Sequence, residues 1–470
     1  MTQKVQHLMN ESKAVRWTAL MLVSLTMLAA YFFVDMIAPL QSLMETSYKW
    51  NPSTYGFFSG SEYLLNVLGF LILSGIILDK MGIRFTGITA TIVMVVGALI
   101  KLYGLSSYFS EGGFGFAFFD SFWKDLNATA KVAAIGYGIF GIGVEMAGIT
   151  VSRAIVKWFK GKELALAMGM EMATARLGAS VAFFFSAMIA GVQDVDGVLS
   201  GNVLNTVYVG CALLAIGFLT FLTYTFMDTK FDKQIQSNKS DEPSEEFKIS
   251  DIGKIFTNRG FIYIALLCVL FYSGIFPFLK YAVNMMQNRL GVSPTVGGNI
   301  SAMLPIGTII LTPLIGMYLD KKGKGATLMI FGAILMTLAH LTYAILPINT
   351  FLAVLAIIIL GIAFSLVPAS MWPSVPKIVE EKYLGSAYAL IFWIQNIGLL
   401  LIPWFIGVVL EWANPGISER IAAGDATAVY NYTFPMLVFS ALGICAIFFG
   451  YLLRKEDIRK GYGLDKPNKV

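Results

Sequence analysis

The sequence is short of charge, histidine and cysteine. Only 13% of its 470 residues are charged, whereas a soluble protein carries about 25%. Two histidines and three cysteines offer little for a metal cluster, and we find no phosphate-binding glycine loop and no positioned nucleophile. Cys211, Cys268 and Cys445 all fall in apolar stretches, where a thiol behaves as a small hydrophobe. We therefore expect no enzyme, no cofactor, no metal site and no disulfide.

Apolar residues are abundant instead, at 57% of the chain, with a mean hydropathy of +0.71. A helix needs about 20 apolar residues to cross the hydrocarbon of a bilayer. We find twelve such spans, which predict an all-α polytopic membrane protein. They lie near residues 16–43, 53–78, 83–104, 131–157, 162–190, 203–227, 259–285, 293–319, 325–346, 349–375, 382–411 and 432–453.

The basic residues predict the orientation of these spans, because cytoplasmic loops hold the excess of Lys and Arg. With the N-terminus inside, 26 of the 34 basic residues fall in cytoplasmic segments, and only Lys49, Lys124, Arg289 and Arg420 fall on the opposite face. Both termini are therefore expected in the cytoplasm. The net charge of +5 then reflects topology rather than nucleic-acid binding. The first span is too long for a cleavable signal peptide and is interpreted as the first membrane helix.

A polar connection divides the spans into two sets of six. Its core is the segment SDEPSEEFKISD, which is too polar to bury. We expect an N-terminal six-helix bundle over residues 1–227, a cytoplasmic linker over 228–258 and a C-terminal six-helix bundle over 259–470. A short interfacial helix is expected in the linker around Ile249 to Phe256.

Two segments at corresponding places in the halves repeat one pattern. GIILDKMGIR follows the second span and GMYLDKKGKG the eighth. Each has a glycine, an aspartate, a second glycine and a cation: Gly75, Asp79, Gly82 and Arg84 in the first, Gly316, Asp320, Gly323 and Lys324 in the second. Glycine allows close helix approach and a tight turn, and the aspartate can pair with a cation across a gate. The repeat resembles the loop signature of the major facilitator superfamily, which implies two pseudo-symmetric six-helix bundles.

Ionisable side chains within the spans are costly in hydrocarbon unless they face a cavity or a partner. They are few: Asp35, Glu62, Glu145, Glu171, Arg176, Lys280 and His340. In the fold that the resemblance implies, Asp35, Glu145 and Lys280 lie on helices that line a central cavity. His340 lies on a peripheral helix, where we expect an uncharged imidazole with a local hydrogen bond.

Glu145 and Arg176 should lie at one depth. They are 15 residues before and 16 residues after the turn near Lys160, and at 1.5 Å per residue both are roughly 23 Å from it. An acid and a base at one level suit a zwitterion, whose amino group needs a carboxylate and whose carboxylate needs a guanidinium. The alternative is a buried salt bridge that only lets two charges survive burial.

The surroundings of the two side chains differ. Gly138, Gly141 and Gly148 share the helix face of Glu145 and leave room beside its carboxylate. Glu171 is rotated about 140° from Arg176 around their common helix. We therefore expect Glu171 to make a structural contact, for example with Arg153.

Several longer stretches resemble one branch of the superfamily, the lysosomal dipeptide transporters. They are YFFVDMIAPLQ, WFKGKELALAMG followed by ARLGAS, FPF at 276–278, MWPSVP at 371–376 and LGSAYALIFWIQNIGL at 384–399. The resemblance implies dipeptide transport, with Glu145 near the peptide amino group and Arg176 near its carboxylate. It adds Tyr31, Asp35, Trp372, Gln395 and Asn396 as further substrate contacts. Lys280 is included as a cavity cation, although it and Glu62 match no family position.

The N-terminal tail has no acidic dileucine sorting signal. We therefore expect a bacterial relative in the inner (plasma) membrane, which is a monomer and needs no accessory subunit. Its partners would be membrane lipid and a small peptide substrate. Two alternatives stay open: a transporter of organic anions or sugars with the same fold, and a transporter-like sensor that binds without turnover. The sequence does not distinguish a uniporter from a proton-coupled transporter.

Overall fold

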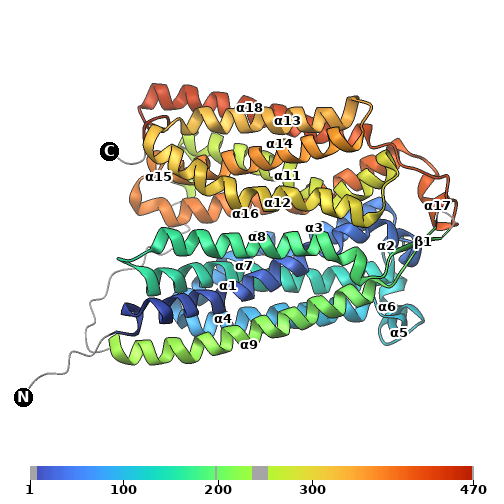
Figure 1. The fold of residues 1–470 in the computed structure, drawn as a ribbon, viewed down its shortest axis with the longest axis horizontal. Helices are drawn as coiled ribbons and strands as arrows, with labels where there is room; N and C mark the ends of the chain where they lie inside the picture. Colours follow the sequence, from blue (N-terminus) through green and yellow to red (C-terminus); the bar gives the residue numbers. More distant parts are fainter. Residues whose placement is uncertain (1–7, 196–197, 236–251, 468–470) are drawn as a thin grey trace, which may run out of the picture.

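The computed structural model describes residues 8–195, 198–235 and 252–467, and long helices lying side by side make up most of it (Figure 1). Eleven helical stretches of these residues are long and apolar enough to cross a membrane. One of them, Pro52–Gly104, contains both the second and the third predicted span. The twelve predicted spans are therefore confirmed as helical.

The membrane helices form two sets. The N-terminal set consists of α1 (Lys13–Asp35), α2 (Gln41–Tyr48), α3 (Pro52–Ser61), α4 (Leu71–Gly104), α7 (Ala128–Phe159), α8 (Leu164–Ile189) and α9 (Val203–Ile235). The C-terminal set consists of α11 (Arg259–Leu290), α12 (Pro294–Lys322), α13 (Gly325–Ile345), α14 (Thr350–Met371), α16 (Leu384–Ala413) and α18 (Thr433–Lys460). In Figure 1 the blue-to-green N-terminal half lies against the yellow-to-red C-terminal half.

Short elements connect these helices. They are α5 (Ser107–Ser110), α6 (Phe116–Ser121), α10 (Ile252–Phe256), α15 (Val375–Ile378), α17 (Ile417–Ala422) and the antiparallel hairpin of β1 (Gln193–Val195) and β2 (Val198–Ser200). The helix α10 falls within the predicted interfacial helix, and α9 runs eight residues past the predicted end of its span. The rest of the linker lies outside the described residues, and the domain boundaries stay a prediction.

The second and third spans form one continuous stretch because a single glycine makes the turn between them. Gly82 has φ 78° and ψ 174° within α4, a conformation that glycine adopts at little cost and other residues avoid. A second glycine, Gly69 with φ 112°, lies in the short π-helical stretch Asn66–Phe70 that precedes α4. The break at Gly82 thus stands where the sequence predicts a loop between two spans.

The helix α1 begins and the helix α18 ends at the same end of the bundle, on the left in Figure 1. We call this the termini end. The elements α5, α6, α17 and β1 lie at the opposite end, which we call the far end. This arrangement agrees with an even number of crossings, while the side of the membrane that each end faces stays a prediction.

The two halves are packed backbone to backbone at the far end. A Cβ atom added to Gly56 would lie 2.2 Å from the Pro403 carbonyl oxygen, and one added to Gly60 would lie 2.1 Å from that of Leu400. Only glycine lets α3 and α16 come this close. Gly298 of α12 approaches the Phe183 carbonyl of α8 in the same way, at 2.3 Å. Backbone contacts therefore close the two seams between the halves at this end, beside a surface pocket of about 460 Å³ that lies between α2 and α11.

Candidate substrate-binding site

Glu145 projects from α7 and Arg176 from α8, and both are partly exposed. Within the described residues neither forms an ion pair with the other. The Arg176 guanidinium carbon lies 4.5 Å from the ring centre of Phe364 and 5.8 Å from that of Phe276, which belong to the C-terminal half. Cation–π contacts of this kind hold a guanidinium without using its hydrogen-bond donors. Arg176 thus reaches across the seam with its donors available.

Tyr31 of α1 lies beside both charged groups. It is partly exposed and within electrostatic range of Arg176, Glu145 and Glu171. The three helices α1, α7 and α8 therefore bring an acid, a base and a phenol to one place.

The predicted contact between Glu171 and Arg153 is wrong. The Arg153 guanidinium pairs with Asp79 of α4 instead, because both side chains lie at the termini end of the N-terminal half. Glu171 is 9% exposed and lies within electrostatic range of Arg176 on its own helix.

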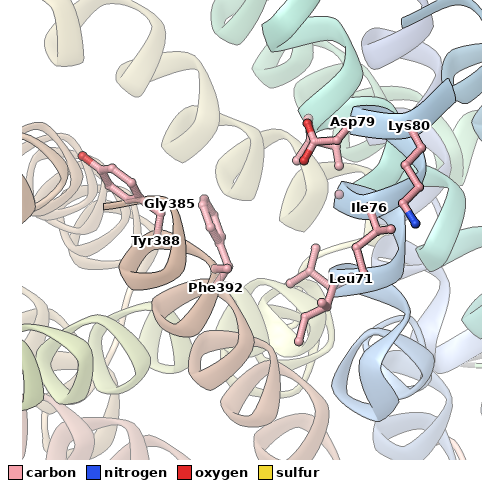
Figure 2. Close-up of a pocket in the computed structure, with 11 residues that line it drawn as sticks. Leu71, Ile76, Asp79, Lys80, Gly385, Tyr388 and Phe392 are labelled. Atoms are coloured by element: carbon pink, nitrogen blue, oxygen red, sulfur yellow. The ribbon is translucent and has the colours of Figure 1, made fainter. Parts of the chain in front are cut away.

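A cavity of about 480 Å³ opens between the halves toward the termini end (Figure 2). In Figure 2 Leu71, Ile76 and Asp79 of α4 face Tyr388 and Phe392 of α16 across this space. The cavity also reaches Ile149, which lies one helical turn from Glu145 on α7. The cavity thus lies on the termini-end side of Glu145.

An aromatic wall connects this cavity to Arg176. Phe392 stacks on Trp372, with ring centres 4.7 Å apart. The Trp372 indole N–H donates to the Tyr272 hydroxyl over 3.1 Å, and Tyr272 stacks on Phe276 at 5.7 Å. Trp372 thus lies behind Phe392, which lines the cavity, and its predicted contact with substrate stays a prediction. Phe276 could have been predicted as a site residue because it belongs to the FPF stretch that resembles the family. No feature of the sequence marks Tyr272 or Phe364 as site residues.

Gln395 and Asn396 lie inside the C-terminal half. Gln395 is 8% exposed and its Oε1 accepts a contact from the Cys268 thiol over 3.4 Å. Asn396 is 1% exposed, and neither polar atom of its side chain has a hydrogen-bond partner in the part of the chain that the structure describes. In this conformation the two amides line the core of the half rather than the open cavity.

Asp35 and Lys280 pair with each other across the two halves. The Lys280 ammonium lies 2.9 Å from Asp35 Oδ1 and donates to the Val34 carbonyl over 2.8 Å. The side chains are only 8% and 7% exposed. Neither charge is presented to the cavity in this conformation, so the pair belongs to the closed far end.

The residues of the repeated motif lie at the termini end. Asp79 pairs with Arg153, and Arg84 pairs with Asp232 of α9 over 3.2 Å. Gly75 lines the cavity, and a Cβ added there would meet no atom within 4 Å.

In the second copy of the motif, Asp320 lies on α12, as does Gly316, which likewise has open space around it. Gly323 caps α12 with φ 71°, and the next residue donates its backbone N–H to the Asp465 carbonyl over 3.0 Å. The contacts described for Asp79, Arg84 and Lys324 therefore lie within their own halves.

His340 of α13 makes a local contact. The His340 imidazole Nε2 lies 2.9 Å from the Gly274 carbonyl oxygen, which confirms the predicted local hydrogen bond. The three cysteines are free.

Two sets of membrane helices that touch at one end and have a cavity between them at the other are typical of transporters. The chain belongs to the Major Facilitator Superfamily, whose family model matches residues 23–283 and 278–466.

Curated relatives share about a quarter of its residues. The chain is 27% identical over 405 residues to the mouse protein named lysosomal dipeptide transporter MFSD1, covering 85% of this chain and 81% of the relative. The zebrafish protein of the same name is also 27% identical, over 93% of this chain and 86% of the relative.

Solved structures agree in fold at lower identity. A bacterial homologue of the human lysosomal transporter Spinster, in an inward-facing and occupied conformation, superposes with a TM-score of 0.69 at 14% identity, covering 95% of this chain and 98% of that one. A D-xylose–proton symporter superposes with a TM-score of 0.65 at 15% identity, over 97% and 99%. These likenesses establish the fold alone.

Proposed function

We propose that this protein carries dipeptides across the membrane, with Glu145 binding the peptide amino group and Arg176 its carboxylate. The observation that carries the proposal is that the two charged groups lie on neighbouring helices, partly exposed, without pairing with each other in the described structure. The names of the relatives, which cover most of the chain, support the same substrate class.

The surroundings of Arg176 favour a substrate carboxylate. Phe276 and Phe364 hold the guanidinium by its π face and leave its edge for a bidentate contact. An extended dipeptide spans roughly 7 Å between its ends, so one end can meet Glu145 while the other meets Arg176. Its side chains would then face the aromatic wall of Trp372 and Phe392.

The Lys280–Asp35 pair favours a zwitterion over an organic anion. An anion transporter would use Lys280 as a second cation beside Arg176, but Asp35 neutralises Lys280 in the closed far end. Arg176 is then the cation of the site, with the acids Glu145 and Glu171 near it, and such a site suits a substrate that carries both an amino group and a carboxylate.

The closed far end and open termini end represent one of two conformations of the cycle. With both termini in the cytoplasm, as the basic residues predict, this is the inward-facing one. We propose a plasma-membrane location and a monomer on the same grounds.

The test removes one end of the substrate at a time. Proteoliposomes would be assayed for counterflow of labelled Ala-Ala against unlabelled Ala-Ala, N-acetyl-Ala-Ala and Ala-Ala-amide. The wild type should prefer free Ala-Ala over either blocked peptide by about 10- to 100-fold, since a hydrogen bond to a charged group contributes about 1.5–3 kcal/mol. Arg176→Ala should lose the discrimination against the amide, and Glu145→Gln that against the acetylated peptide.

Ser180→Ala serves as a control on the same face of α8, because its hydroxyl donates only to the Arg176 backbone carbonyl. It should keep both preferences. If Glu145 and Arg176 were only a structural pair, both variants would lose thermal stability and neither would change the preference between the peptides. Peptide binding without any counterflow would indicate a sensor instead.

A further inference from the structure

Four ionisable side chains lie buried between the substrate site and the closed far end. They are Asp35 of α1, Glu62 just after α3, Lys101 of α4 and Lys280 of α11, with exposed fractions of 6%, 4%, 0% and 5%. Buried charges are expensive unless each is paired or neutralised. Asp35 and Lys280 pair with each other, which leaves Glu62 and Lys101 to be explained.

The hydrogen bonds around Glu62 indicate the protonation state of its carboxyl group. The Tyr137 hydroxyl oxygen lies 2.7 Å from the Val34 carbonyl oxygen and 2.8 Å from Glu62 Oε2. A hydroxyl has one proton to donate, so beside an ionised Glu62 only one of these acceptors could receive it in full. A protonated Glu62 satisfies both contacts, because it donates to Tyr137 while Tyr137 donates to Val34.

Lys101 supplies a countercharge for the state in which that proton has left. Its ammonium has no hydrogen-bond partner among the described residues. It lies over three aromatic rings instead, 4.4 Å from the centre of Phe33, 5.0 Å from Phe58 and 4.3 Å from Tyr137. Cation–π contacts can hold a desolvated ammonium. Tyr137 therefore contacts both groups: its ring lies under the Lys101 ammonium and its hydroxyl is hydrogen-bonded to Glu62.

Glu62 also stands between the two working parts of the transporter. The titratable and charged groups that face it come from each helix packed around it: Tyr31 and Asp35 of α1, Lys101 of α4, Tyr137 and Glu145 of α7, Lys280 of α11, and the adjacent Tyr63. The Lys280–Asp35 pair seals the far end, and Glu145 belongs to the substrate site. A change in the charge of Glu62 therefore changes the electrostatic potential at the Lys280–Asp35 pair and at Glu145.

We propose that Glu62 carries a proton with each transport cycle, so that this protein is a proton-coupled symporter. The proposal rests on the proposed function for its substrate. In the far-end-open conformation Glu62 takes a proton from water on that side. Closing the far end buries Glu62 under Tyr137 and forms the Lys280–Asp35 pair, and only the protonated acid fits the hydrogen bonds there. The proton then leaves to water in the cavity past Glu145, and the remaining carboxylate faces the Lys101 ammonium.

The test measures accumulation in proteoliposomes whose membrane potential is held at zero with valinomycin and equal potassium. With one unit of pH gradient, acid outside, the wild type should accumulate labelled Ala-Ala about tenfold, since one proton per substrate transmits a tenfold ratio per pH unit. Glu62→Gln should keep Ala-Ala counterflow and should not accumulate it above the outside concentration. A wild type that exchanges Ala-Ala but stops at equal concentrations would overturn the proposal, as would accumulation by Glu62→Gln.

Two further measurements separate the possible failures. If Glu62→Gln does not fold, Tyr137→Phe keeps the ring over Lys101 and removes the hydroxyl, and its accumulation should fall below that of the wild type; accumulation equal to the wild type would count against the proposal. If the wild type shows no counterflow of any dipeptide, the proposed function fails but Glu62 can still be tested. On acidification from about pH 9 to about pH 5, the detergent-solubilised wild type should then take up about one more proton per molecule than Glu62→Gln, and equal uptake would overturn its role.

Discussion

The two ends of the seam between the halves use the same residue types in different ways. At the far end an aspartate–cation pair, Asp35–Lys280, joins the halves and is almost fully buried. At the termini end the pair Asp79–Arg153 lies within the N-terminal half, with side chains 33% and 39% exposed. Glycines of the far end touch backbone across the seam, whereas Gly75 faces open space. An ion pair or a glycine contact therefore indicates a gate between the halves only when its two members are known to lie in different halves.

Burial decides how much each pair contributes. Removing one partner from a buried pair leaves an uncompensated charge and costs about 3–5 kcal/mol, while an exposed pair contributes about 0–1 kcal/mol. The far end is thus stabilised by contacts whose loss should change the conformation. The termini end is free to open and close at little cost.

Lys280→Ala should have the largest effect on this comparison. It leaves the Asp35 carboxylate buried without a cation, so we expect the closed far end to be destabilised by about 3–5 kcal/mol. Labelling of Ser301→Cys, which is fully buried one helical turn from Gly298 at the far-end seam, by an impermeant maleimide should increase at least tenfold, measured with the native cysteines replaced. The double variant Asp35→Asn/Lys280→Ala should regain much of the protection. Equal labelling of the single and double variants would show that the ion pair does not hold this end closed.

Substituting one glycine at each end should push the protein in opposite directions. A Cβ at Gly60 would lie 2.1 Å from the Leu400 carbonyl oxygen, and overpacking of this kind costs about 1–3 kcal/mol. Gly60→Ala should therefore favour the far-end-open conformation. Gly75→Ala is tolerated here and should obstruct only the conformation in which the termini end closes.

The same maleimide assay checks this prediction. Ser301→Cys should be labelled more in the Gly60→Ala background and less in the Gly75→Ala background than in the parent protein. A change in the same direction for both glycines would contradict the difference between the two ends.

The sequence was sufficient for the fold because hydropathy and the basic residues act over whole helices. It also predicted Glu145 and Arg176 at one level, since helix geometry converts residue number into depth. It did not predict the partner of Lys280 or of Arg153, because a partner on another helix depends on how that helix is rotated and packed. Lys101 was not among the ionisable side chains that the sequence placed within the spans, and nothing in the sequence pattern brings Phe33, Phe58 and Tyr137 together around it.

The smallest effect should come from Arg153→Ala at the termini end. The pair with Asp79 is exposed enough for water and salt to screen it, so we expect a loss of at most about 1 kcal/mol and a fall in Tm below about 2 °C. That fall should disappear in 1 M NaCl, where the Debye length is about 3 Å, whereas the effect of Lys280→Ala should persist because its site excludes salt. The measurement is the Tm of each variant, determined by thermal unfolding at low and at high salt. If Arg153→Ala destabilised the protein as much as Lys280→Ala, or if salt left its effect unchanged, the termini-end pair would be a lock of the same kind as the far-end pair.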